Sequence, residues 1–418
     1  MTAIEPVYVG PHAIAEAQRF CRRYADRTMV LVADTNTYAA AGQALNDALQ
    51  RARLSVHAII LTGDHIHADD TALGRVLAHS PRGDALFIAV GSGTVTDITR
   101  YISYRLGMPF VSLPTAASVD GYASPGAPLV IEGIKSTHHS QPPLAIFADI
   151  DVIRRAPPRL TAAGVGDMLA KTTSTADWRL GRLLWDEPYD DTIAERSLTA
   201  ARECIDSVDE IATQSESGLR RLMDALAESG LCMLDFGDSR PASGAEHHIS
   251  HLWEMFSLRD GGRQPLHGEQ VGVATILAAR LYARLRELTR VEVERMLTTS
   301  RPVGRAEQIA EIEAAYGALA PSIVSNHAAF LEMTNTRYTR LCRAVITQWD
   351  HVQALAAGVP APQQLEQILR RVGGPTTTAQ LGFPELQVRA GVVCGHYLRE
   401  RFTVIKLARL LGLSVYPL

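Results

Sequence analysis

The feature that most constrains the fold is a regular alternation of short apolar runs and amphipathic segments between residues 6 and 149. The apolar runs have the length and the aliphatic content of buried strands. They lie at Thr28–Ala33, Leu54–Leu61, Ala85–Val90 and Pro109–Leu113, and the amphipathic segments between them lie at 38–52, 69–79 and 94–106. The alternation predicts a mostly parallel sheet covered by helices, which binds ligands beyond the carboxyl ends of its strands.

The pattern changes near the double proline Pro157-Pro158, which suits a hinge between two domains. Before it, the sequence predicts a β-hairpin over 129–137 and one more strand over 144–150. Beyond Ala162 helical periodicity dominates, and helices are expected at 199–214, 218–229, 270–288, 305–319, 323–331, 363–372 and 397–411. We therefore predict an α/β domain over residues 1–155 and an all-α domain over residues 156–418.

Charge and cysteine content exclude several classes of protein. The chain has 418 residues, of which 41 are basic and 45 acidic, so it lacks the positive surplus that nucleic-acid binding usually needs. No apolar run approaches the ~18–20 residues of a membrane helix, and the first residues do not resemble a signal peptide. Five widely spaced cysteines, an odd number, indicate reduced thiols. We expect a cytoplasmic protein without nucleic-acid or membrane partners.

A glycine-rich turn follows the third apolar run. Val90 is followed by Gly91-Ser92-Gly93-Thr94 and then by an expected helix that contains Asp97. Glycines at such a turn let the backbone approach a pyrophosphate, whose charge the free amides and the helix dipole stabilise. A tight turn needs glycine for its backbone angles in any case, so this turn alone leaves nucleotide binding and a structural role both open.

A second polar loop follows the next run, at residues 114–124, and is rich in small and hydroxyl-bearing side chains. Thr115 and Ser118 could bond a ribose or a phosphate, and Asp120 could face a substrate hydroxyl. Taken alone, the loop would be an ordinary turn. Two such loops at adjacent strand ends predict a binding site.

The helical half contains three short motifs with metal-ligating residues. Asp167 closes a GVGD motif, His247 and His251 belong to EHHISH, and His267 opens an HGE motif. One carboxylate and two imidazoles, from Asp167, His247 and His267, would leave open positions on a divalent ion for a substrate oxygen. His247 and His251 are four residues apart and would share a helical face, so one can bind the ion while the other reaches a substrate oxygen or relays a proton. Core histidines satisfied by carbonyl groups are the structural alternative.

Four ordered segments of the sequence resemble one known family, the sn-glycerol-1-phosphate dehydrogenases. That family is grouped with dehydroquinate synthases, glycerol dehydrogenases and iron-type alcohol dehydrogenases. The segments are LPTAASVDGYAS (113–124), FADIDVIRRAPPRLTAAGVGDMLAKTTSTADWRL (147–180), SRPASGAEHHISHLWEM (239–255) and PLHGEQVGVAT (265–275). The chain departs from relatives in having GSG where they often have GGG, and its tail beyond residue 300 carries no matching motif.

The resemblance implies a Rossmann-like α/β domain, an all-α domain and an active site in the cleft between them. NAD(H) or NADP(H) would contact residues of the glycine turn and of the second loop. These are Gly91, Gly93, Thr94, Val95, Thr96, Asp97, Thr115, Ala116, Ala117, Ser118 and Ser124. One divalent metal, with Zn²⁺ expected first and Ni²⁺ or Fe²⁺ as alternatives, would be bound by Asp167, His247 and His267. Asp120, Asp167 and His251 would be the catalytic and substrate-binding residues, and the enzyme would be a homodimer.

The expected reaction is the metal-dependent reduction of the C2 ketone of dihydroxyacetone phosphate to sn-glycerol 1-phosphate by NAD(P)H, a step of phospholipid metabolism. Lys135, Lys171 and Arg263 are candidates for binding the substrate phosphate, with a structural salt bridge as the alternative for Lys171. Asp34, after the first apolar run, would disfavour a 2′-phosphate and hence NADP. Two alternative functions stay open: the same chemistry on another small phosphorylated or phosphonate-bearing ketone, and a dehydroquinate-synthase-like NAD-dependent lyase or cyclase.

Overall fold

The computed structural model describes residues 4–63, 65–262 and 264–417, which group into two units. The first unit comprises Met1–Met168, Arg202–Asp238 and Arg371–Gly373, and the second comprises Leu169–Ala201, Ser239–Arg370 and Gly374–Leu418. The first unit therefore includes a segment from well beyond the boundary expected after residue 155. The domain boundary expected after residue 155 therefore remains a prediction.

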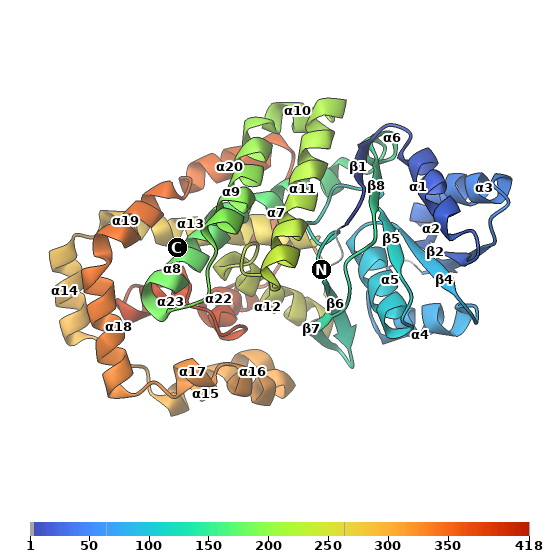
Figure 1. Cartoon of the computed structure of the whole chain (residues 1–418). Coiled ribbons are helices and arrows are strands. Elements are labelled where there is room, and N and C mark those ends of the chain that lie inside the picture. Colours follow the sequence, from blue (N-terminus) through green and yellow to red (C-terminus); the bar gives the residue numbers. More distant parts are fainter. Residues whose placement is uncertain (1–3, 64, 263, 418) are drawn as a thin grey trace. The chain divides into compact units, whose positions relative to one another are not determined.

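A six-stranded sheet organises the first unit (Figure 1). All its strands run parallel, in the order β1-β8-β5-β4-β2-β3. They are β1 (Val7–Gly10), β2 (Thr28–Asp34), β3 (Val56–Leu61), β4 (Ala85–Val90), β5 (Phe110–Leu113) and β8 (Ile146–Asp149). The expected parallel sheet is confirmed, and β1 is an edge strand that the sequence analysis missed.

Apolar side chains lie on both faces of this sheet, which is why helices cover both. Along β2, Leu31 belongs to one apolar cluster and its neighbour Val30 to the other, as the two-residue period of a strand requires. The first cluster is completed by α1 (Ala13–Cys21) and α3 (Gln43–Arg51), and the second by α4 (Asp70–His79) and α5 (Gly93–Arg105). The other helices that begin in this unit are η1 (Arg22–Tyr24), α2 (Thr35–Thr37), η2 (Tyr38–Gly42), α6 (Ile150–Arg154), α7 (Pro158–Leu169), α10 (Val208–Ala212) and α11 (Glu216–Phe236).

The expected β-hairpin is confirmed and lies outside the large sheet. Strands β6 (Gly126–Ile131) and β7 (Ile134–His139) pair antiparallel, with Ile131 opposite Ile134. The two residues between them, Glu132 and Gly133, both have positive φ, at 52° and 78°. Positive φ at both positions is what the common two-residue hairpin turn requires.

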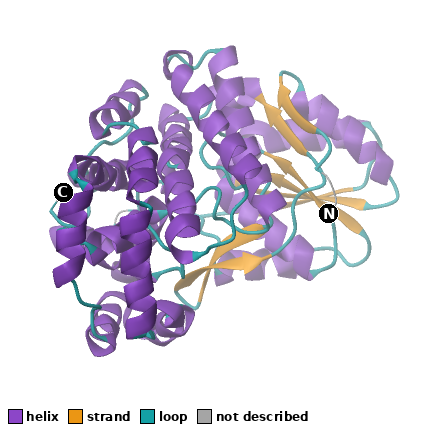
Figure 2. Cartoon of the chain, turned by 60° about the vertical axis from the view of Figure 1, so that its left-hand side comes forward, coloured by secondary structure: helices purple, strands orange, loops and turns teal. Residues whose placement is uncertain are grey.

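Among the described residues of the second unit, helices are joined by loops and no strand occurs (Figure 2). Two long helices, α12 (Ala245–Asp260) and α13 (His267–Glu287), pack against each other at its centre. The other helices that begin in this unit are α8 (Lys171–Trp185), α9 (Asp191–Asp206), α14 (Arg290–Thr299), α15 (Arg305–Tyr316), η3 (Gly317–Leu319), α16 (Ala320–Asn326), α17 (Ala328–Leu331), α18 (Asn335–Thr347), α19 (Trp349–Gly358), α20 (Pro362–Arg371), α21 (Thr378–Leu381), α22 (Glu385–Cys394), η4 (Gly395–Tyr397) and α23 (Val404–Leu410). Among the described residues, no helix combines the length and apolar character needed to cross a membrane.

The tail beyond residue 300, which carried no motif, supports the two central helices. Helix α22 packs on α12, while α19 and α23 pack on α13. At one of these contacts Gly391 is needed, because a Cβ there would lie 2.1 Å from Nε1 of Trp253 on α12. The tail is therefore part of the scaffold that holds α12 and α13.

Three expected helices differ from the structure. The helix predicted over 323–331 is two, since α16 ends at Asn326 and α17 begins at Ala328. The helix predicted over 199–214 is two helices, since α9 ends at Asp206 and α10 begins at Val208. The helix predicted over 397–411 is reduced to α23, because the preceding backbone is hydrogen-bonded to buried carboxylates instead. Phe402 N donates to Glu187, and Val404 N donates to Asp177 over 2.7 Å.

Candidate active site

The glycine turn joins β4 to α5 in the first unit. Its N-cap residue, Ser92, makes no side-chain cap and instead shares hydrogen bonds with Ser118 Oγ and, at 3.0 Å, Tyr122 Oη. The first-turn amides of α5, from Gly93 to Val95, therefore receive no acceptor from Ser92. Free amides at the positive end of a 13-residue helix form a site suited to a pyrophosphate.

Packing rather than backbone angles explains the glycines of this turn: it requires Gly91 and leaves little room at Gly93. Neither Gly91 nor Gly93 has a positive φ. A Cβ on Gly91 would lie 2.6 Å from Cβ of Val95, and one on Gly93 would lie 3.2 Å from Cγ2 of Val119. The glycines thus let the turn lie directly against α5 and the 114–124 loop.

The 114–124 loop is held in place from inside the first unit. The Arg100 guanidinium, fully buried, donates to Asp97 at 2.7 Å, to Gly121 O and to Tyr122 O. Burial lowers the pKa of Arg100, and the Asp97 carboxylate opposes that shift. Asp97, expected beside the pyrophosphate, thus also anchors the second loop, and Arg100 is an organising residue that the sequence analysis did not single out.

The hydroxyl and small residues expected to contact coenzyme line this loop. Thr115, Ala116, Ala117 and Ser118 are all buried, and Tyr122 Oη donates to Ala116 O. Thr96 Oγ1, on the first turns of α5, is buried and has no hydrogen-bond partner among the described residues. Ser124 Oγ accepts from Gly126 N at 3.0 Å, so this side chain shapes the start of β6.

Asp120 and Asp167 lie together in the first unit. The backbone N–H of Asp120 donates to Asp167 Oδ2 over 3.0 Å, and Ser229 Oγ donates to Asp120 Oδ2 over 2.8 Å. Both aspartates are buried. Ser229 comes from α11, a part of the chain in which the sequence shows no motif, so only the structure reveals it.

Asp34 ends β2 next to the glycine turn. The parallel register pairs Val32 with Ala89, so Asp34, two residues on, is level with Gly91. Its carboxylate accepts from Thr37 N at 2.8 Å and begins α2. Asp34 therefore places a carboxylate at the end of the strand beside the glycine turn.

The second unit brings three histidines together, here called the histidine cluster: His247, His251 and His267. His247 and His251 share one face of α12, with ring centroids 6.0 Å apart, and His267 is the first residue of α13. Its ring centroid lies 5.4 Å from each of the other two. The helical spacing predicted for His247 and His251 is confirmed.

His248 points away from the cluster, as expected. It is fully buried, and neither ring nitrogen has a partner among the described residues. Burial, with the positive charges of Arg401 and Lys406 nearby, lowers its pKa well below the ordinary value, so the ring is neutral.

Two glutamates hold the cluster by the Nδ1 atoms of its rings. Glu246 Oε1 lies 2.9 Å from Nδ1 of His247. Glu254 Oε2 lies 3.0 Å from Nδ1 of His251, and its other oxygen lies 3.4 Å from Nδ1 of His267. His251, Glu254 and His267 also offer donor atoms close enough together to hold a metal. Both glutamates fall inside the segment SRPASGAEHHISHLWEM, but the sequence assigned neither a role.

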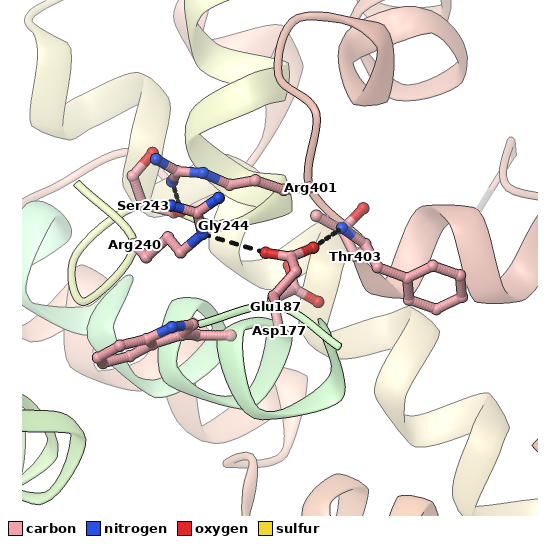
Figure 3. Close-up of a pocket in the computed structure, with 9 residues that line it drawn as sticks. Asp177, Glu187, Arg240, Ser243, Gly244, Arg401 and Thr403 are labelled. Carbon is pink, nitrogen blue, oxygen red and sulfur yellow. Dashed lines mark hydrogen bonds and ion pairs between the residues drawn. The ribbon is translucent and has the colours of Figure 1, made fainter. Parts of the chain in front are cut away.

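The loop before α12 is fixed by buried polar contacts (Figure 3). Arg401 Nη1 donates to Ser243 O over 2.8 Å, and Arg240 pairs with buried Glu187 at 3.2 Å. These residues line a cavity of about 10 Å³, room for roughly one water and far too small for a coenzyme. The side chains around this cavity hold the loop that precedes α12.

Asp177, on the wall of the same cavity, anchors the first turn of α12. It accepts from Ala245 N and from Tyr282 Oη, each at 2.7 Å. Burial, followed by the charge of Glu246, raises the pKa of Asp177 to about 7.

The three basic candidates for the substrate phosphate differ in setting. Lys171 is fully buried and donates to Ala242 O over 3.1 Å. It starts α8, whereas Asp167 belongs to α7, so the two do not share one continuous helix. Lys135 lies half-buried on β7, and Arg263 lies outside the described residues.

Comparison with known proteins identifies similar sequences over most of the chain. The sequence profile of the family "Iron-containing alcohol dehydrogenase" matches residues 8–157. A glycerol-1-phosphate dehydrogenase (NAD(P)+) of Geobacillus thermodenitrificans is 37% identical over 96% of this chain and 92% of its own length. A protein of the same name from Halalkalibacterium halodurans is 36% identical over 96% of this chain and 91% of its own.

Solved structures show the same fold at low sequence identity. An iron-containing alcohol dehydrogenase of Corynebacterium glutamicum aligns with a TM-score of 0.61 at 14% identity, covering 100% of this chain and 97% of its own. A glycerol dehydrogenase of Schizosaccharomyces pombe aligns with a TM-score of 0.59 at 17% identity, over 98% of this chain and 90% of its own. The expected combination of a parallel sheet and a helical region is thereby confirmed.

Proposed function

The chain belongs to the family of glycerol-1-phosphate dehydrogenases that use NAD(P)+, and from this premise we propose that it reduces dihydroxyacetone phosphate to sn-glycerol 1-phosphate. The family and the enzyme class expected from the sequence, an NAD(P)-linked oxidoreductase acting on a CH–OH group, are confirmed. The observation that carries the proposal is the identity of 37% over 96% of the chain, because this match includes both the glycine turn and the histidine cluster.

The first unit is proposed to bind the coenzyme. The free amides of α5 and its dipole would hold the pyrophosphate, with Thr96 and the 115–118 segment beside it. An orphaned buried hydroxyl, Thr96 Oγ1, and glycines that keep the turn open fit this role. When bound, NAD(P)H supplies the hydride. Asp34, level with Gly91, would favour NAD(H), since a carboxylate there repels a 2′-phosphate.

Asp167, His247 and His267 are proposed to hold one divalent cation, with Zn²⁺ the first candidate. The donor set fits, since imidazole nitrogens and a carboxylate suit zinc, nickel and iron. The Nδ1 atoms of both histidines already face glutamates, so Nε2 is the atom available to a metal. When bound, such an ion supplies Lewis-acid polarisation of a ketone.

The remaining residues are proposed to bind substrate and to move the proton. His251, on the same face as His247, would deliver a proton to the oxygen at C2. Asp120 would accept a hydrogen bond from a substrate hydroxyl, in an orientation kept by Ser229. Lys171 would supply positive charge for the phosphate group.

The test follows absorbance of reduced nicotinamide in protein reconstituted in parallel with Zn²⁺, Ni²⁺ or Fe²⁺. We expect oxidation of NADH in proportion to dihydroxyacetone phosphate, and sn-glycerol 1-phosphate rather than its enantiomer as product. Turnover of other phosphorylated ketones alone would refute the substrate assignment, and conversion without net NADH loss would indicate the lyase or cyclase. A homodimer and a cytoplasmic location stay predictions; analytical ultracentrifugation tests the first.

A further inference from the structure

We propose that Glu246 and Glu254 are positioning residues that fix the tautomer of the histidine cluster, so that each ring presents Nε2 to its ligand. The inference rests on the metal site of the proposed function and extends it to two residues outside the metal-ligand set. All the contacts that support it lie within the second unit.

Glu246 is a buried carboxylate whose other contacts leave it only one way to bind His247. It is fully buried, its Oε1 accepts from Gly244 N at 2.6 Å, and its Oε2 accepts from Thr173 Oγ1 at 2.8 Å. The oxygen that faces Nδ1 of His247 over 2.9 Å is the same Oε1 that accepts the Gly244 N–H, so it acts as an acceptor there, which places the His247 proton on Nδ1 and the lone pair on Nε2.

Glu254 binds one ring of the cluster by a hydrogen bond and lies close to a second. Its Oε2 lies 3.0 Å from Nδ1 of His251, and its Oε1 lies 3.4 Å from Nδ1 of His267. Its side chain is 12% exposed, less than either ring it faces. Each oxygen thus faces one ring: Oε2 forms the hydrogen bond that favours the Nδ1–H form of His251, and Oε1 lies at ion-pair distance from Nδ1 of His267 and favours the same form there.

Such partners matter for a metal in two ways. They remove the need to select one tautomer when the ion binds, and their negative charge makes the ligand nitrogen more basic. Loss of a partner of this kind typically weakens metal binding about 10–100-fold.

Glutamine variants separate the two effects. Glu246→Gln can keep its oxygen at the position shared by Gly244 N and His247, so the tautomer survives while the charge is lost. Glu254→Gln has one amide oxygen for two rings, so either His251 or His267 must lose its acceptor. Asp260→Asn is the matched control, because Asp260 also lies on α12 but contacts Arg259 and Gln387 rather than a histidine.

The experiment uses full-length protein stripped of metal and titrated with Zn²⁺ alone against a chromophoric chelator, with NADH binding measured on the same samples. We expect the Kd for Zn²⁺ to rise about 10–100-fold in both glutamine variants and to stay within about twofold in the control. In ¹⁵N-histidine NMR spectra of the metal-free protein, Glu254→Gln should convert one ring of the cluster to the Nε2–H tautomer. Glu254→Asp, which keeps two acceptors, should restore the tautomer and part of the affinity.

The outcomes distinguish this inference from the proposed function. Wild-type protein that binds NADH but no Zn²⁺ would refute both. Wild-type protein that binds Zn²⁺, with glutamine variants that bind it equally well and show unchanged tautomers, would overturn the positioning role alone. If Glu254→Gln fails to bind NADH, the comparison uses Glu254→Asp and Glu246→Gln instead. In that case, unchanged Zn²⁺ affinity in Glu246→Gln refutes the positioning role.

Discussion

Gly164→Ala should destabilise the protein and loosen the coenzyme loop, although alanine is the better helix former. Gly164 lies in α7, and a Cβ there would be 2.1 Å from the carbonyl oxygen of Ala117 and 2.9 Å from its carbonyl carbon. Ordinary contacts of this kind begin at 3.4 Å, so the helix and the loop would have to separate by more than 1 Å. The obstructing atoms are backbone, which cannot rotate away as a side chain would.

Two opposing effects determine the magnitude. Replacing glycine by alanine inside a helix gains about 1 kcal/mol of helix propensity. Overpacking a tight contact costs about 1–3 kcal/mol, and a backbone clash belongs at the upper end of that range. We therefore expect a net loss of about 2 kcal/mol in the free energy of unfolding. Because Ala117 belongs to the proposed coenzyme loop, the Kd for NADH should also rise.

Urea denaturation and NADH fluorescence titration measure the two effects. Gly74→Ala is the matched control, since Gly74 lies within α4 and a Cβ there would meet nothing within 4 Å. The control should gain up to about 1 kcal/mol and bind NADH normally. Equal stabilisation by both substitutions would refute the packing argument.

Three further predictions concern the metal, the coenzyme preference and the titration of a buried carboxyl group. His247→Ala should abolish Zn²⁺-dependent turnover while NADH still binds, and full activity after exhaustive chelation would contradict the metal assignment. Asp34→Ser should raise kcat/KM for NADPH relative to NADH by about tenfold, which corresponds to removing a repulsion of ~1.4 kcal/mol. Serine is chosen because its side chain can still cap α2. An unchanged ratio of kcat/KM would contradict the ribose assignment. The pKa of Asp177 is raised from 3.8 to about 7. Between these pH values the folded protein retains a proton that the unfolded chain loses. The contribution of Asp177 to the free energy of unfolding therefore falls as pH rises from about 4 to about 7. Asp177→Asn should flatten that fall in urea denaturation series, and identical slopes would exclude the raised pKa.

The fold was predictable where periodicity and composition agree. Apolar runs such as Ala85–Val90 are buried on both faces in the structure, which is the arrangement that an uninterrupted aliphatic run indicates. The tail was harder, because its backbone is satisfied by residues distant in sequence. Phe402 N donates to the carboxylate of Glu187, and Val404 N donates to that of Asp177. No local sequence pattern predicts a hydrogen bond between residues more than 200 positions apart.

The candidate site shows the same division. The helical spacing of His247 and His251 follows from sequence alone, because residues four apart on a helix share a face. The roles of Glu246 and Glu254 do not, since adjacent and three-apart carboxylates on a helix are usually solvated surface residues. Only burial and the positions of Gly244, Thr173 and the cluster histidines show that these carboxylates face imidazole nitrogens.

The sequence by itself determined the parallel sheet, the glycine turn, the helical second half and the family, because each depends on local periodicity or on ordered motifs. Tertiary structure decided why the residues of those motifs are needed. Gly91 and Gly164 are required by neighbours rather than by their own backbone angles, and Ser229 reaches Asp120 from a helix more than 100 residues away. The physical reason is that close packing and buried hydrogen bonds depend on which distant segments meet, and periodicity records only which face of an element is buried.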